Sequence, residues 1–129
     1  MSHSIILVDD SDTFREGLKF YLENILSCHV CAEASNGKEF MQLKNKCLAD
    51  IILMDLEMPE MSGIETARLF LSEYSKNIIA ITSYEDNIYL IGLKEAGFKG
   101  YINKKNIYDE LQNAMKQVMG GKIYFPEMK

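Results

Sequence analysis

The chain has 129 residues, of which 47% are apolar and 26% charged, and it carries a net charge of −5 at neutral pH. This length and apolar content are typical of one globular domain and exclude a disordered chain. The acidic balance argues against direct nucleic-acid binding by these residues, because surfaces that bind nucleic acids are normally basic.

No apolar run approaches the roughly 18 residues that a membrane-spanning helix needs. The first residues, Met1–Ser4, lead straight into an apolar run without the basic and apolar regions of a signal peptide. We therefore expect a cytoplasmic protein with no membrane association.

Short apolar runs alternate with helical periodicities along the chain. The predicted strands are Ile5–Val8, Val30–Ala34, Ile51–Met54, Ile78–Ile81 and Gly100–Asn103. The predicted helices run from Phe14 to Ile25, from Asn36 or Gly37 to about Cys47, from Ser62 to about Tyr74, from Asp86 to Ala96, and from Asn106 to Gly120. This alternation predicts an α/β fold of the (βα)5 type, with a doubly wound parallel five-stranded sheet in the order 2-1-3-4-5.

Polar side chains follow four of these strands: Asp9 and Asp10 the first, Asp55 the third, Thr82 the fourth and Lys104 the fifth. Because the carboxyl ends of parallel strands border one edge of the sheet, we expect these groups to lie together. Taken singly, each residue is as readily explained as a turn or capping residue. The argument for a site comes from their convergence.

Three neighbouring carboxylates repel one another, and a hard divalent cation would remove that repulsion. Oxygen ligands of this kind suit Mg²⁺, with Mn²⁺ as an alternative, and the lack of cysteine or histidine at this edge argues against zinc. A carboxylate beside such a cation can accept a phosphoryl group. An ammonium group and a hydroxyl, as in Lys104 and Thr82, would then neutralise and bind the phosphoryl oxygens.

Four segments carry a resemblance to a known family: Ile6–Asp10, Leu53–Gly63, Ile81–Ser83 and Gly100–Lys104. Their residues and order resemble the receiver domain of bacterial two-component response regulators, which has the CheY-like version of the flavodoxin-like fold. Further segments, such as Arg15–Leu18 and Leu93–Gly97, resemble the NarL/LuxR subfamily more closely.

The resemblance implies a phosphoryl-transfer site. Asp55 would accept a phosphoryl group from a sensor histidine kinase, and Lys104 would contact it. Magnesium would be bound by Asp10 directly, by Asp9 through water, and by Asp55 and the backbone carbonyl of Glu57.

The resemblance also implies a switch. Thr82 would move toward the phosphoryl group, and Tyr101 would turn inward as it does so. Strand 100–103 and its flanking helices, with Ile88, Tyr89 and Lys94, would carry the signal onward. Glu57 and Tyr84 each lie two positions beyond a site residue, so we expect them at the rim, where they would alter the phosphate lifetime. 

The domain organisation follows from the same pattern. Residues 1–121 are the expected receiver domain, and Lys122–Lys129 form a tail outside the alternation, where a linker to a DNA-binding domain would begin. We expect DNA to be contacted only through that further domain, and a homodimer to form on phosphorylation.

Two alternatives remain open at this point. Asp10-Ser11-Asp12-Thr13 resembles the DxDxT motif of haloacid-dehalogenase-type phosphatases, in which Asp10 would be the nucleophile and Asp12 the acid/base. A receiver-like domain could instead serve as a constitutive interaction module. The Cys28–Cys31 CxxC precedes a predicted strand rather than a helix, so we interpret it as structural rather than redox-active.

Overall fold

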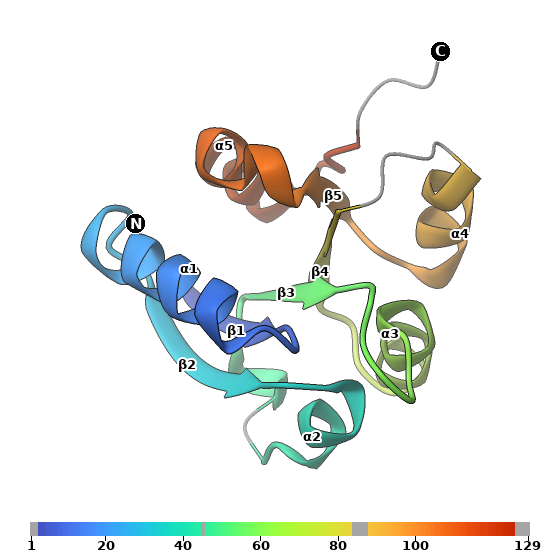
Figure 1. The fold of residues 1–129 in the computed structure, drawn as a ribbon. Helices are drawn as coiled ribbons and strands as arrows, with labels where there is room; N and C mark the ends of the chain where they lie inside the picture. Colours follow the sequence, from blue (N-terminus) through green and yellow to red (C-terminus); the bar gives the residue numbers. More distant parts are fainter. Residues whose placement is uncertain (1–2, 45, 84–87, 126–129) are drawn as a thin grey trace.

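The computed structural model describes residues 3–44, 46–83 and 88–125 (Figure 1). Its strands are β1 (Ser4–Val8), β2 (His29–Ala34), β3 (Ile51–Asp55), β4 (Asn77–Thr82) and β5 (Gly100–Asn103). Its α-helices are α1 (Asp12–Asn24), α2 (Gly37–Gln42), α3 (Gly63–Leu71), α4 (Ile88–Ala96) and α5 (Ile107–Met119). Two 3-10 turns are also present: η1 (Lys46–Leu48) lies between α2 and β3, and η2 (Lys104–Asn106) between β5 and α5. The predicted (βα)5 alternation is confirmed.

The strands form one five-stranded sheet in the order β2-β1-β3-β4-β5, with every pair parallel. This is the predicted order. Strand β3 is buried along its whole length, and β1 and β4 along all but their first residue. Their unbroken apolar runs are therefore explained by burial on both faces of the sheet.

Alternate residues of each strand face opposite sides of the sheet, and each side has its own core. Ile5 and Leu7 of β1 pack with α1 and α5, whereas Ile6 and Val8 pack on the side of α2, α3 and α4. Figure 1 shows these two groups of helices on either side of the sheet. Burial on both sides fixes the strand register, and with it the positions of the strand ends.

Side-chain caps begin several of the described helices. Ser11 accepts the backbone N–H of Phe14 at the start of α1, and Ser62 with Glu65 forms a complete capping box at the start of α3. These bonds satisfy N–H groups that have no partner inside the helix. Asp86, where the fourth helix was predicted to begin, lies outside the described residues.

The second helix is shorter than predicted, since α2 ends at Gln42 and not near Cys47. Leu43 has an extended backbone (φ −66°, ψ 131°), which ends the helix, and Lys46 Nζ donates to the Leu43 carbonyl at 3.1 Å. The lysine thus donates to a carbonyl that would have accepted a backbone N–H if the helix had continued.

The last helix, α5, begins directly after Asn106, where its start was predicted. Asn106 makes no capping hydrogen bond with its side chain. Asn103 does so instead, by accepting the N–H of Lys105 at 3.0 Å, and a 3-10 turn leads from there into α5. The chain therefore turns immediately after β5, and Lys104 stands at the first position of that turn.

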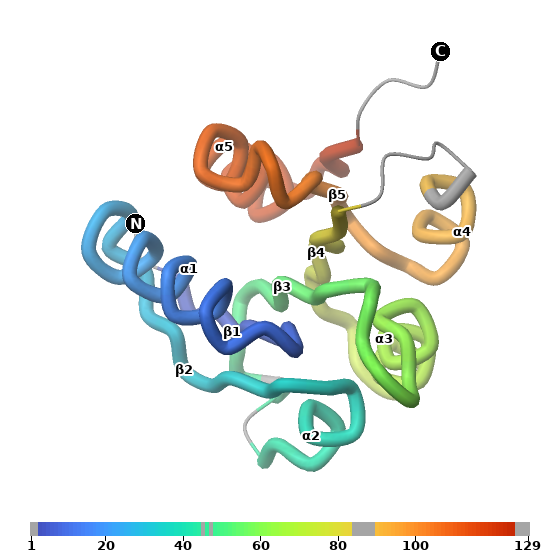
Figure 2. The backbone as a smooth tube through the Cα atoms, viewed as in Figure 1, coloured from blue at the N-terminus to red at the C-terminus, as the bar shows by residue number. Residues whose placement is uncertain are grey.

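Part of the tail, Lys122–Phe125, runs along the open edge of β5, although the sequence pattern placed it outside the fold (Figure 2). Tyr124 donates its N–H to the Lys99 carbonyl at 2.8 Å and accepts the N–H of Tyr101 at 2.9 Å. Its hydroxyl donates to Glu110 Oε1 at 2.7 Å, and burial together with this neighbouring carboxylate raises the pKa of Tyr124 to about 12. The edge of the sheet is thus partly covered.

The loop between β3 and α3 turns back tightly on Asp55. Leu56 donates its N–H to Ile81 O of the neighbouring strand at 3.1 Å, and Gly63 donates to Leu56 O at 3.1 Å. A methyl group on Gly63 would overlap the Asp55 carbonyl oxygen and lie 2.9 Å from Leu56 Cα. Both obstacles are backbone atoms, so glycine is required by close approach.

We expect Gly63→Ala to destabilise the protein by about 1–3 kcal/mol through this overlap. Gly92→Ala is the matched control, because a methyl group there meets nothing within 4 Å and lies in the interior of α4. It should stabilise the fold by about 1 kcal/mol through helix propensity. Urea unfolding of both variants measures the difference, and equal midpoints would contradict this account of the loop.

Candidate functional site

Three carboxylates meet at the carboxyl ends of β1 and β3, as the topology predicts. One oxygen each from Asp9, Asp10 and Asp55 lies within 4.8 Å of the others. Asp9 and Asp55 are 3% and 1% exposed, whereas Asp10 faces solvent. The site therefore has a buried floor and one open carboxylate.

Lys104 is brought to the same place from the end of β5. Its Nζ lies 2.9 Å from Asp9 Oδ2 and 3.6 Å from Asp55 Oδ1. The ring of Phe14, from α1, lies beneath the ammonium with its centroid 4.5 Å away. A single cation is thus held between two buried carboxylates and an aromatic face.

One cation does not neutralise this cluster. Burial and the nearby charge of Asp9 raise the pKa of Asp55 from the ordinary 3.8 to about 7, although Lys104 and the Glu57 N–H act in the opposite direction. Burial by itself would lower the pKa of Lys104, but its hydrogen bond with Asp9 and the neighbouring negative charges raise it overall. The lysine stays charged while Asp55 takes up a proton near neutral pH.

The carboxylates also have unused ligand capacity. Oδ2 of Asp9 and Oδ2 of Asp55 are buried and accept no hydrogen bond of regular geometry from the described residues, apart from the ion pair of Asp9 with Lys104. Buried carboxylate oxygens with so few donors, together with excess negative charge, suit a hard divalent cation. The donor set therefore fits Mg²⁺.

Thr82 and Glu57 contact each other at the rim of the site. The Thr82 hydroxyl donates to Glu57 Oε1 at 2.6 Å, and the N–H of Ser83 donates to the same oxygen at 3.1 Å. The backbone N–H of Glu57 donates to Asp55 Oδ1 at 3.2 Å. The sequence placed Thr82 and Glu57 near the site, but not in this mutual contact.

Two supporting residues, Arg15 and Phe14, were not identified from the sequence as part of the site. Arg15 Nε donates to the Asp9 carbonyl at 2.7 Å, and its NH1 group donates to Glu33 Oε1 at 3.1 Å. Arg15 thereby ties the turn after β1 to α1 and β2. Phe14 was assigned only to the apolar face of its helix, and nothing in helical periodicity indicates its contact with Lys104.

The expected switch residue Tyr101 is half-buried and packs against the core on the side of α4. This position is compatible with a ring that can be turned inward or outward. The expected rim residue Tyr84 lies outside the described residues, as do the side chains of Ile88 and Tyr89. Lys94 is described, and its Nζ lies 5.1 Å from the ring centroid of Phe125.

The geometry disfavours the phosphatase alternative. Asp12, the acid/base of that reading, is 81% exposed and pairs with Arg15. Asp10, its nucleophile, is also exposed, whereas the buried carboxylate with a raised pKa is Asp55. The cysteines likewise give no support to a redox site, because burial raises the pKa of Cys31 and disfavours its thiolate.

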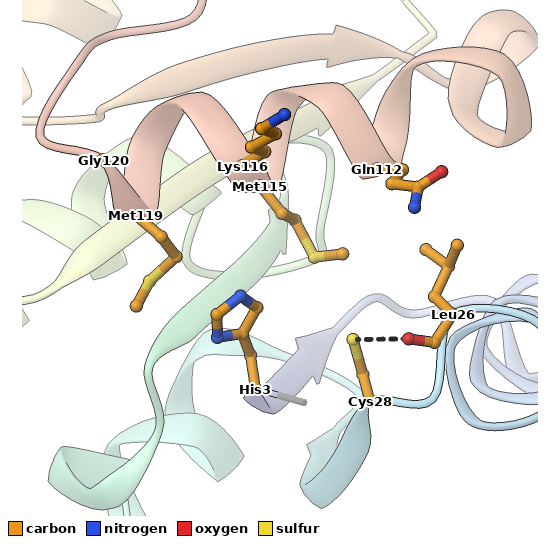
Figure 3. Close-up of a pocket in the computed structure, with 8 residues that line it drawn as sticks. All are labelled: His3, Leu26, Cys28, Gln112, Met115, Lys116, Met119 and Gly120. Atoms are coloured by element: carbon orange, nitrogen blue, oxygen red, sulfur yellow. Dashed lines mark hydrogen bonds between the residues drawn. The ribbon is translucent and has the colours of Figure 1, made fainter. Parts of the chain in front are cut away.

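A hollow at the opposite end of the strands lacks these groups. It has a volume of about 580 Å³ and opens between α5 and the start of β1 and β2 (Figure 3). Its lining is His3, Leu26, Cys28, Gln112, Met115, Lys116, Met119 and Gly120. Its lining has no carboxylate, so it offers no ligands of the kind that suit a hard divalent cation.

The raised pKa of Asp55 predicts how the stability of the protein changes with pH. In metal-free protein the unfolded chain ionises Asp55 near pH 3.8 and the folded chain near pH 7, so this residue costs stability increasingly between these values. Asp55→Asn should therefore stabilise the metal-free protein, with a gain that grows from about pH 4 to about pH 7 and then levels off at about 2–4 kcal/mol.

Urea unfolding with a chelator present, across this pH range, measures that gain. Asp12→Asn is the control, because Asp12 is exposed and should show no such growth. A gain from Asp55→Asn that is the same at every pH would contradict the raised pKa.

Comparison with known proteins shows which family this chain resembles. The family profile described as "Response regulator receiver domain" matches residues 5–116. The chain is 37% identical over 122 residues to the transcriptional regulatory protein YdfI of Bacillus subtilis, covering 94% of this chain and 57% of that protein. It is 31% identical to the response regulator UvrY of Escherichia coli, covering 94% of this chain and 56% of that protein.

A solved structure gives the same result. The crystal structure of a LuxR-family two-component response regulator from Aurantimonas superposes with a TM-score of 0.89 at 30% identity, covering 96% of this chain and 89% of that one. The chain spans little more than half the length of the curated relatives named here. With the family profile matching most of its length, the chain belongs to the receiver domains of two-component response regulators, and its relatives are of the NarL/LuxR type.

Proposed function

We propose that this chain is a phosphorylation-dependent switch in which Asp55 accepts a phosphoryl group from a sensor histidine kinase. The observation that carries the proposal is the buried Asp55 carboxylate beside Lys104, with a second buried carboxylate and an open one next to it. In the reaction, an Asp55 oxygen forms a bond to phosphorus as the phosphorus–nitrogen bond to the kinase histidine breaks, and the imidazole leaves with the bonding pair.

The residues of this chain supply positioning and charge. The Glu57 N–H, at 3.2 Å from Asp55 Oδ1, orients the carboxylate, and the Lys104 ammonium is available to a phosphoryl oxygen. Asp9, Asp10, Asp55 and the Glu57 carbonyl are the proposed ligands of Mg²⁺, with Mn²⁺ as a substitute. The bound cation would neutralise charge on the transferred group. Loss of the phosphoryl group to water would follow in the same site.

The proposed switch joins this chemistry to an output. Thr82 would donate its hydroxyl to the phosphoryl group, Tyr101 would turn inward, and Glu57 with Tyr84 would influence the phosphate lifetime. Transcription would be regulated through a DNA-binding domain in a longer chain that continues past the 122–129 tail, and phosphorylation would favour a homodimer. The named relatives support this, because YdfI is described as a transcriptional regulatory protein. A cytoplasmic location goes with the proposal, since kinases that draw on ATP work there.

The acceptor is tested by incubating the protein with acetyl phosphate and Mg²⁺. Wild-type protein should gain a hydroxylamine-labile acyl phosphate, detected by intact-mass spectrometry as one added phosphoryl group, and Asp55→Asn should gain none. Asp12→Asn, which changes an exposed aspartate, should be phosphorylated like wild type. Phosphorylation that survives Asp55→Asn would remove Asp55 as the acceptor.

The metal ligands make a separate prediction. Asp10→Asn should weaken Mg²⁺ binding by about 10-fold or more, because it removes a charged oxygen ligand from a site that relies on charge. Asp12→Asn again is the control, with affinity unchanged within about 2-fold. Isothermal titration measures both, and equal affinities in the two variants would exclude Asp10 as a ligand.

A further inference from the structure

The Glu57 side chain holds two hydrogen-bond donors at the end of β4. Its Oε1 accepts the Thr82 hydroxyl at 2.6 Å and the Ser83 N–H at 3.1 Å. A short hydroxyl–carboxylate bond is charge-assisted and stronger than a bond between neutral groups. In the unphosphorylated protein, the Thr82 hydroxyl and the Ser83 N–H therefore both donate to one carboxylate oxygen of Glu57.

These donors stand next to the acceptor carboxylate. Asp55 and Ile81 are partners in the parallel pairing of β3 and β4, so Thr82 follows directly beyond the partner of Asp55. Leu56 continues that pairing by donating to Ile81 O at 3.1 Å. Thr82 and Ser83 are thus the first two residues beyond the strand partner of Asp55, at the same edge of the sheet.

We propose that the Glu57 carboxylate is an internal stand-in for the phosphoryl group, bound to Thr82 and Ser83 until phosphorylation of Asp55 displaces it. This inference rests on the proposed function of Asp55. It deepens that function by naming a competitor for the same donors.

The competition follows from the donor count. A threonine hydroxyl has one proton and a backbone amide has one, so neither can donate fully to Glu57 and to a phosphoryl oxygen at once. Two anions on the same donors also repel each other. Glu57 must leave, and breaking its two charge-assisted bonds opposes the activated state.

The test compares Glu57→Gln and Glu57→Ala with wild type, using beryllofluoride with Mg²⁺ as the phosphoryl analogue. Removing the competing charge should tighten beryllofluoride binding by about 10-fold, as expected for a lost hydrogen bond to a charged group. Glu60→Gln is the matched control, because it removes the same charge from an exposed neighbouring side chain in the same loop. Its affinity should match wild type within about 2-fold.

A second measurement needs neither metal nor analogue. In the unliganded protein, the Ser83 amide proton should shift upfield in both Glu57 variants and stay in place in Glu60→Gln, as seen in proton–nitrogen correlation spectra. Unchanged resonances elsewhere in these spectra show that the variants are folded. In a Thr82→Ala background the effect of Glu57→Gln on beryllofluoride binding should shrink, because one of the shared donors is gone.

The outcomes separate this inference from the function on which it rests. If wild-type protein does not bind beryllofluoride, the proposed phosphoacceptor function fails. If wild type binds it, Asp55→Asn does not, and both Glu57 variants bind as wild type or more weakly, the function stands and the stand-in role of Glu57 is overturned. An unmoved Ser83 amide in both variants overturns it as well.

Discussion

The chemistry of the site depends on one incompletely neutralised charge, the Asp55 carboxylate at the end of a strand that is buried along its whole length. Lys104 is 3.6 Å away, but it lies closer to Asp9, at 2.9 Å, so one ammonium serves two buried acids. Burial and the neighbouring charge of Asp9 raise the pKa of Asp55 to about 7, and the shared ammonium offsets them only in part. A folded chain bears such a cost only where the surrounding core fixes the residue in place, and β3 does so with neighbours on both sides.

The polar groups near Asp55 form two sets, one made up of hydrogen-bond acceptors and the other of hydrogen-bond donors. Around Asp9 and Asp55, the two buried Oδ2 atoms accept no hydrogen bond of regular geometry from the described residues apart from the ion pair of Asp9 with Lys104. At the end of β4 the reverse holds, since Thr82 and Ser83 offer donors to a single Glu57 oxygen. A cation suits the first set and an anion the second, and phosphoryl transfer brings both to the same edge.

Much of this arrangement could be predicted from the sequence, because parallel strands that are buried on both faces leave little freedom in register. The positions of Asp9, Asp55, Thr82 and Lys104 at one edge follow from that rule alone. The contact of Thr82 with Glu57 could not be predicted, since it depends on side-chain rotamers in an irregular loop. Asn103 as a cap, in place of Asn106, likewise depends on how sharply the chain turns after β5.

Strand β5 lies between the charged site and the segment Lys122–Phe125, to which it is joined by a hydrogen bond between Tyr101 and Tyr124. Lys104, which touches both buried acids, lies three positions after Tyr101, whose N–H donates to the Tyr124 carbonyl at 2.9 Å. Tyr124 is held in turn by Glu110 of α5. A displacement of β5 that follows a change at the carboxylates must therefore either break the hydrogen bond to Tyr124 or move Tyr124 and α5 together with the strand. That bond lies on the edge of β5 away from β4, where Tyr124 is the described residue that bridges to the strand.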